Sequence, residues 1–73
     1  MGIRVFYTTE KVIDRERTGR SVRQYRIEKG RTLREVGKVL GVGVSYLCDL
    51  EHGRKPWNPE MVEKIGRAIE DLK

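Results

Sequence analysis

The sequence predicts a compact all-α bundle of four or five helices, preceded by an extended N-terminal arm. Three observations predict it. The chain has 73 residues, of which 37% are hydrophobic, and this is enough for one small core. Helix-capping residues and glycines divide the chain into short segments. Apolar residues recur at helical spacing in the last of these segments. The arm is assigned to residues 1–18 and the helical domain to residues 19–73.

The arm contains a short stretch with strand-like patterning. Ile3 to Tyr7 alternates in polarity and is rich in β-forming residues, which indicates an extended segment. We expect it either to cover the core or to pair with the same segment of a second subunit. Residues 10–17 show no clean period and are predicted as a short turn or helix. Phe6 and Tyr7 are expected to pack, because platforms that stack bases need more aromatic residues.

The first two helices of the domain are bounded by recognisable caps. The first is predicted to begin at Thr18 or Gly19 and to end before Gly30, a residue suited to a left-handed C-terminal cap. The second is predicted over residues 33–40. Its N-cap is Thr32, and Glu35 follows three residues later, at the spacing of a capping box.

A third helix follows the second after a very short joint. Gly41 ends the second helix, and the third begins near Gly43 or Val44 and continues to Glu51, before Gly53. A joint of this length with glycine at its head forces a steep crossing, which is the geometry of a helix-turn-helix. An ordinary helical hairpin in a small bundle is the alternative.

The fourth helix starts at Asn58-Pro59, an N-cap followed by proline at the first helical position. Trp57, just before it, is expected to cover the edge of the core, with a partner-facing anchor as the alternative. An apolar stripe at 3.5 spacing is expected to be core, although it could also form a dimer seam: Val62, Ile65, Ile69 and Leu72.

Charge and composition narrow the class of protein. The net charge is +5, and residues 1–31 alone carry nine Lys/Arg against four Asp/Glu. This excess is either a solvated helix face or an electrostatic footprint for a polyanion. One cysteine excludes an internal disulfide framework, and no apolar run approaches the length of a membrane span. With no signal peptide evident, we expect a cytoplasmic protein that does not bind membranes.

Four runs in the centre of the chain fall in register with a known motif. They are Lys29-Gly30-Arg31-Thr32-Leu33-Arg34-Glu35-Val36-Gly37, Leu40-Gly41-Val42, Ser45-Tyr46-Leu47 and Leu50-Glu51-His52-Gly53-Arg54. Over residues 19–70 the chain resembles the phage repressor/Cro (XRE-like) family of helix-turn-helix DNA-binding proteins. The resemblance implies a repressor-like bundle that binds double-stranded DNA sequence-specifically as a transcriptional regulator. It also implies a homodimer on a two-fold symmetric site, without a small-molecule cofactor.

The resemblance also implies individual roles. Thr32 matches a cap where helix amides meet a phosphate. Val44, Ser45 and Asp49 match positions that reach base edges, and Tyr46 matches a residue beside the groove wall. The full set of candidate DNA-binding residues is Thr32, Arg34, Lys38, Gly43, Val44, Ser45, Tyr46, Asp49, Arg54 and Lys55.

Further positions match structural or electrostatic roles. Gly37 takes a small-residue place where the second helix packs on the third. Arg26 and Glu51 match an ion pair found in some members. Phosphate contacts are expected mainly from basic residues around the motif, namely Arg31, Arg34, Lys38, Arg54 and Lys55.

The third helix departs from the pattern, because it contains no Arg, Lys, Gln or Asn for bidentate base reading. The side chains that remain are Val44, which could contact a thymine methyl, and Asp49, which could accept a hydrogen bond from the cytosine amino group. Ser45 could form a hydrogen bond with either base. This apolar character favours an alternative function: a protein-interaction module, antitoxin-like or a phage accessory protein, built on the same fold.

Nothing in the sequence indicates an enzyme or a metal protein. No paired carboxylates, phosphate-cradling glycine loop or nucleophile with a base partner is present. Cys48 and His52 are four residues apart on one helix, but two ligands without a third or fourth do not make a metal site. A polar cysteine near the groove and a solvated histidine are the simpler expectation.

Overall fold

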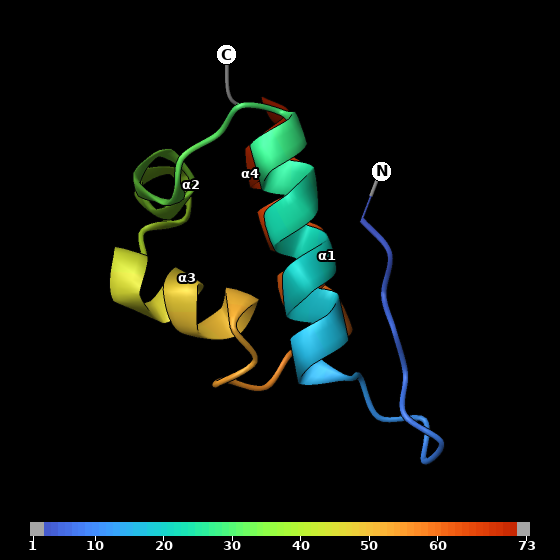
Figure 1. The fold of residues 1–73 in the computed structure, drawn as a ribbon. Coiled ribbons are helices and arrows are strands. Elements are labelled where there is room, and N and C mark those ends of the chain that lie inside the picture. Colours follow the sequence, from blue (N-terminus) through green and yellow to red (C-terminus); the bar gives the residue numbers. More distant parts are fainter. Residues whose placement is uncertain (1–2, 72–73) are drawn as a thin grey trace.

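A computed structural model describes residues 3–71 and contains four α-helices (Figure 1). They are α1 (Arg15–Glu28), α2 (Leu33–Leu40), α3 (Val44–Glu51) and α4 (Pro59–Asp71). Within residues 3–71 the only strand-like pairing is an isolated antiparallel bridge between Tyr7 and Ile13. The predicted all-α bundle is confirmed, with four helices. Leu72, the last residue of the predicted apolar stripe, lies outside the described residues.

The helices surround one core. α1 contacts α3 and α4, and α2 contacts the same two helices. In Figure 1, α2 and α3 lie on one side of α1, and the N-terminal arm runs along the other. Every helix contributes to the buried cluster, which consists of Ile13, Val22, Tyr25, Val36, Leu47, Leu50, Trp57, Val62, Ile65, Ala68 and Ile69.

The first helix begins earlier than predicted. Its N-cap is Asp14, whose carboxylate accepts a hydrogen bond from the Arg17 amide at 3.0 Å. Thr18 and Gly19 lie inside α1 and are buried, so the prediction that either of them caps the helix was wrong. Residues 15–18, which the sequence assigned to the arm, form the first turn of this helix.

The arm is attached to α1 by two hydroxyl groups. The buried Thr18 Oγ1 accepts from the Phe6 amide at 3.1 Å and lies 3.3 Å from the Phe6 carbonyl, to which it donates. Ser21 Oγ accepts from the Arg4 amide at 2.9 Å. Ile3 and Val5 pack against the core cluster. The arm therefore covers part of the core of its own chain.

The two aromatic residues of the arm differ in environment. The Phe6 ring is partly buried, and the Arg17 guanidinium lies 4.4 Å from its centroid. The packing prediction is thus confirmed for Phe6. It was wrong for Tyr7, whose side chain is largely exposed. Ile3 and Val5 pack against the core, whereas Tyr7, two residues further along the same alternation, is 55% exposed.

We expect Thr18→Val to destabilise the fold by about 1–3 kcal/mol. The substitution keeps the shape of the side chain but leaves the Phe6 amide without its acceptor at a partly buried position. Urea unfolding followed by circular dichroism measures the loss, and Thr18→Ser, which keeps the hydroxyl, is the matched control. Equal stability of Thr18→Val and the parent, with equal hydrogen-exchange protection of the Phe6 amide, would contradict this assignment.

The entry to α4 is built as predicted. Asn58 Oδ1 accepts from the Met61 amide at 2.8 Å, and Pro59 is the first residue of the helix. Trp57 is buried in the core, and its Nε1 donates to the Leu50 carbonyl at 2.9 Å, so it is not a partner-facing anchor. Val62, Ile65 and Ile69 are buried within the single chain, which confirms their core role.

Candidate nucleic-acid interface

The second helix begins with a reciprocal cap. Thr32 Oγ1 accepts from the Glu35 amide at 3.1 Å, and Glu35 Oε1 accepts from the Thr32 amide at 2.8 Å, so the predicted capping box is confirmed. The bond from the Thr32 amide, followed by that from its hydroxyl, lowers the pKa of Glu35 below its ordinary value. The amides of Leu33 and Arg34 precede the first helical bond, which Val36 donates to Thr32. Such amides suit an anion at the helix terminus.

The joint between α2 and α3 is tight. Gly41 has φ 73° and ends α2 in the left-handed conformation, which favours glycine. A Cβ on Gly37 would lie 2.7 Å from the Val42 carbonyl oxygen and 3.4 Å from Leu47 Cδ1. Gly37 therefore does more than fill a small-residue position, because even alanine would displace the backbone of the turn. The close packing of α2 on α3 fixes the direction of α3.

The far end of α3 is tied to α1 by the predicted ion pair. Arg26 Nε and Nη2 donate to the two carboxylate oxygens of Glu51 at 2.8 and 3.0 Å. The side chains are only 11% and 5% exposed. Arg26 Nη1 also donates to the Arg31 carbonyl at 2.7 Å. Arg31 itself is half-buried, and its Nε donates to the Ile69 carbonyl at 3.2 Å, so its guanidinium links the interhelical turn to α4.

The third helix has a buried and an exposed side. Leu47 and Leu50 are in the core, whereas Val44 and Tyr46 are 42% and 36% exposed. Ser45, between them, is also exposed. Gly43 is the N-cap of α3 and provides no side-chain hydrogen bond. The first turn of α3 is therefore exposed, and it offers the aliphatic side chain of Val44, the hydroxyl of Ser45 and the phenol of Tyr46.

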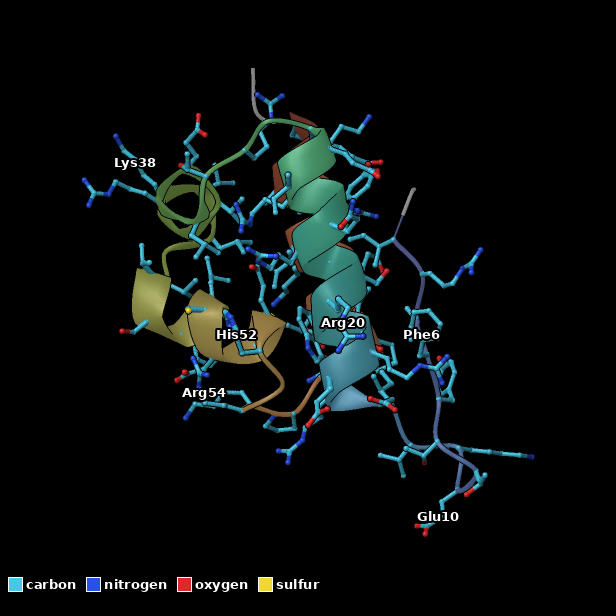
Figure 2. The ribbon with its side chains drawn as sticks, viewed as in Figure 1. Phe6, Glu10, Arg20, Lys38, His52 and Arg54 are labelled. Atoms are coloured by element: carbon cyan, nitrogen blue, oxygen red, sulfur yellow. The ribbon has the colours of Figure 1, made fainter. Side chains whose placement is uncertain are left out.

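Exposed cations lie on both sides of α3. Arg34 and Lys38 are four residues apart on α2 and so share a face, and Arg54 and Lys55 lie in the loop after α3. Figure 2 shows Lys38 and Arg54 on the same side of the molecule, with α3 between them. One of the predicted cations of α2 and one of those in the loop thus lie on either side of the exposed helix.

One contact in this region was not predicted from the sequence. Arg54 Nε donates to Asp49 Oδ1 at 2.7 Å, and the Arg54 amide donates to the Asp49 carbonyl at 2.8 Å. This carboxylate raises the pKa of Arg54 above its ordinary value. Asp49, expected to reach a cytosine, is already engaged by a cation from its own chain. The available signal was a pair of opposite charges five residues apart across the turn at Gly53.

Cys48 and His52 lie together without further ligands. Cys48 Sγ is 3.6 Å from His52 Nδ1, and the same nitrogen is 2.8 Å from the Cys48 carbonyl oxygen, to which it donates. Over residues 3–71, no three His, Cys, Asp or Glu side chains are grouped to hold a metal ion.

None of the helices in this range is long and apolar enough to cross a membrane.

Comparisons with known proteins agree with this geometry. Residues 17–70 match the family described as a helix-turn-helix domain. Over 56 residues the chain is 39% identical to the transcriptional regulator ClgR of Mycobacterium tuberculosis, from strain CDC 1551 / Oshkosh and from strain ATCC 25618 / H37Rv. The alignment covers 77% of this chain and 50% of each relative, so the chain spans about half the length of the curated relatives it matches. No solved structure is significantly similar.

Proposed function

Because this chain belongs to the helix-turn-helix domain family, we propose that it binds double-stranded DNA sequence-specifically as a transcriptional regulator of the repressor/Cro type. The similarity to a transcriptional regulator supports this proposal. α3 then serves as the recognition helix in the major groove, and α2 lies across the DNA backbone.

The observation that carries the proposal is the exposed first turn of α3 between two groups of cations. Val44 and Ser45 are exposed on a helix whose direction is fixed at both ends, by the Gly37 contact and by the Arg26–Glu51 pair. Positively charged surroundings of an exposed helix suit a duplex, whose phosphates flank the groove.

Within this proposal the contacts divide by chemistry. Arg34, Lys38 and Lys55 bind phosphates, together with the α2 amides that follow Thr32. Val44, Ser45 and Tyr46 lie at base edges and the groove wall. One copy presents a recognition helix of only eight residues, so we propose that a homodimer places two copies of α3 about 34 Å apart on a two-fold symmetric site.

Binding to duplex DNA is expected to weaken steeply with salt. With three cations on phosphates, the logarithm of the association constant should fall with the logarithm of salt concentration at a slope of about −3 for each bound copy. Fluorescence anisotropy with a labelled random duplex at several salt concentrations measures the slope. A footprint on a selected sequence then shows whether the protected half-sites are symmetric.

Two double variants, one on α2 and one on α4, test whether the salt dependence comes from the cations of α2. Arg34→Gln combined with Lys38→Gln should reduce the magnitude of the slope by about two for each copy. The control variant, Lys64→Gln combined with Arg67→Gln, removes the same amount of charge from α4, where both cations pair with glutamates. It should change the salt slope by less than one. A slope near zero for the parent protein would contradict DNA binding.

A second candidate function is favoured by one observation. Val44 and Tyr46 are exposed on either side of Ser45 in α3, and their apolar surface would also suit a protein partner. In that case the helix-turn-helix would be a protein-interaction module, and duplex DNA would show only weak binding without base preference. The same titration separates the two functions.

A further inference from the structure

Arg54 lies against α3 although it follows the helix in sequence. Gly53, with φ 76°, turns the chain back, and the Arg54 amide donates to the Asp49 carbonyl at 2.8 Å. The Arg54 side chain then lies along the helix, with Nε 2.7 Å from Asp49 Oδ1 and Nη2 3.8 Å from Cys48 Sγ. The loop thus supplies to the side of α3 a guanidinium that the helix sequence lacks.

The Arg54 guanidinium lies next to the face of α3 that carries Val44 and Ser45. Cys48 and Asp49 follow Val44 and Ser45 by four residues each, so each pair lies on one face of the helix. The Arg54 side chain is 57% exposed. Its contacts within residues 3–71 use Nε and Nη2, which leaves the terminal Nη1 and Nη2 groups with donors for a ligand. Two parallel donors are what the O6 and N7 acceptors of guanine require.

The net charge of the Asp49–Arg54 pair favours a base over a phosphate as the ligand of Arg54. Asp49 holds the guanidinium with a carboxylate that would repel a phosphate oxygen brought to the same place. The acceptors of guanine carry only partial charge, so a nearly neutral Asp49–Arg54 pair accommodates them better than it accommodates an anion. Lys55, the next residue, is exposed and forms no ion pair within residues 3–71, which suits a phosphate contact.

We propose that Arg54 reads a guanine in the major groove and that Asp49 acts as its positioning residue instead of contacting a base itself. This inference rests on the proposed DNA-binding function and identifies the base-reading side chain that α3 lacks. It reassigns Arg54, which the repressor/Cro resemblance places on the DNA backbone.

The experiment begins with selection of preferred duplexes from a random pool by the unaltered protein. Dissociation constants are then measured for the selected duplex and for each of its single-base variants. Arg54→Lys keeps the charge but loses the planar pair of donors, and should reduce the preference for guanine at one position of each half-site about tenfold. The salt slope should not change. Asp49→Ala should reduce the preference at the same position.

Lys55→Gln is the matched control from the same loop. It should weaken binding to all duplexes alike and reduce the magnitude of the salt slope by about one for each copy. Circular dichroism checks that each variant is folded, which is expected because Arg54 and Lys55 are exposed and Asp49 is not part of the buried core.

Two results would overturn the inference while leaving DNA binding intact. One is an unchanged base preference in Arg54→Lys. The other is loss of a cytosine preference at a different position in Asp49→Ala, which would show that Asp49 reads a base directly. A parent protein that enriches no sequence and binds no duplex at low salt would instead overturn the proposed function, and this inference with it.

Discussion

Replacing Arg26 by methionine is expected to lower the free energy of unfolding by about 3–5 kcal/mol. The substitution leaves the Glu51 carboxylate, whose side chain is 5% exposed, without the two donors that satisfy it. It also removes the bond from Arg26 to the Arg31 carbonyl. A domain of this size has a total stability of only about 4–11 kcal/mol, so the substitution would remove a large part of it. Urea denaturation followed by circular dichroism measures the loss.

The double variant Arg26→Met with Glu51→Leu measures the interaction energy between the two side chains apart from their other contacts. Because it removes both charges, it should be more stable than the sum of the two single changes predicts, by at least about 1 kcal/mol. Additivity of the two single changes within about 0.5 kcal/mol would show that the pair contributes no coupling between α1 and the end of α3.

Replacing Gly19 by alanine is the second substitution with a large expected effect. An added Cβ would lie 2.5 Å from the Leu50 carbonyl oxygen and 2.6 Å from that of Glu51. Both atoms are backbone, so α1 and α3 must move apart. Overpacking of this kind costs about 1–3 kcal/mol or more, against about 1 kcal/mol gained from the better helix propensity of alanine. We expect a net loss of up to about 2 kcal/mol in the free energy of unfolding, measured by urea denaturation.

Gly43→Ala is the control for this substitution. A Cβ at Gly43 meets no atom within 4 Å, and the residue has φ −76° in an extended conformation. We expect it to change stability by less than about 1 kcal/mol. If Gly19→Ala were as stable as Gly43→Ala, the close approach of α1 to the end of α3 would be wrong.

The parts of the fold that were predicted correctly depend on local chemistry. The Thr32–Glu35 cap and the end of α2 at Gly41 are decided by neighbours in sequence, so their signals are readable without the fold. The start of α1 was mistaken because Thr18 resembles a cap. Its hydroxyl is instead taken by the backbone of Phe6, twelve residues away, and Asp14 caps the helix. Long-range contacts of this kind leave no local pattern.

The same distinction holds for the candidate site. The position of α3 and of the cations on α2 follows from helix spacing, and the Arg26–Glu51 pair followed from the resemblance. The direction of the Arg54 side chain depends on the turn at Gly53 and on Asp49, and the five-residue spacing of the two charges indicates a contact without fixing that direction. The sequence therefore identified Arg54 as a candidate but not the surface on which it lies.

Because Trp57 is buried, its intrinsic fluorescence reports on the interior of the protein. Trp57 is the only tryptophan in the chain, and its indole nitrogen is bonded to a carbonyl on the core side of α3. Bases bound at the exposed side would not stack on the indole. A change in its emission on adding a ligand would therefore record a change in the packing around Trp57 in the core, without any attached dye.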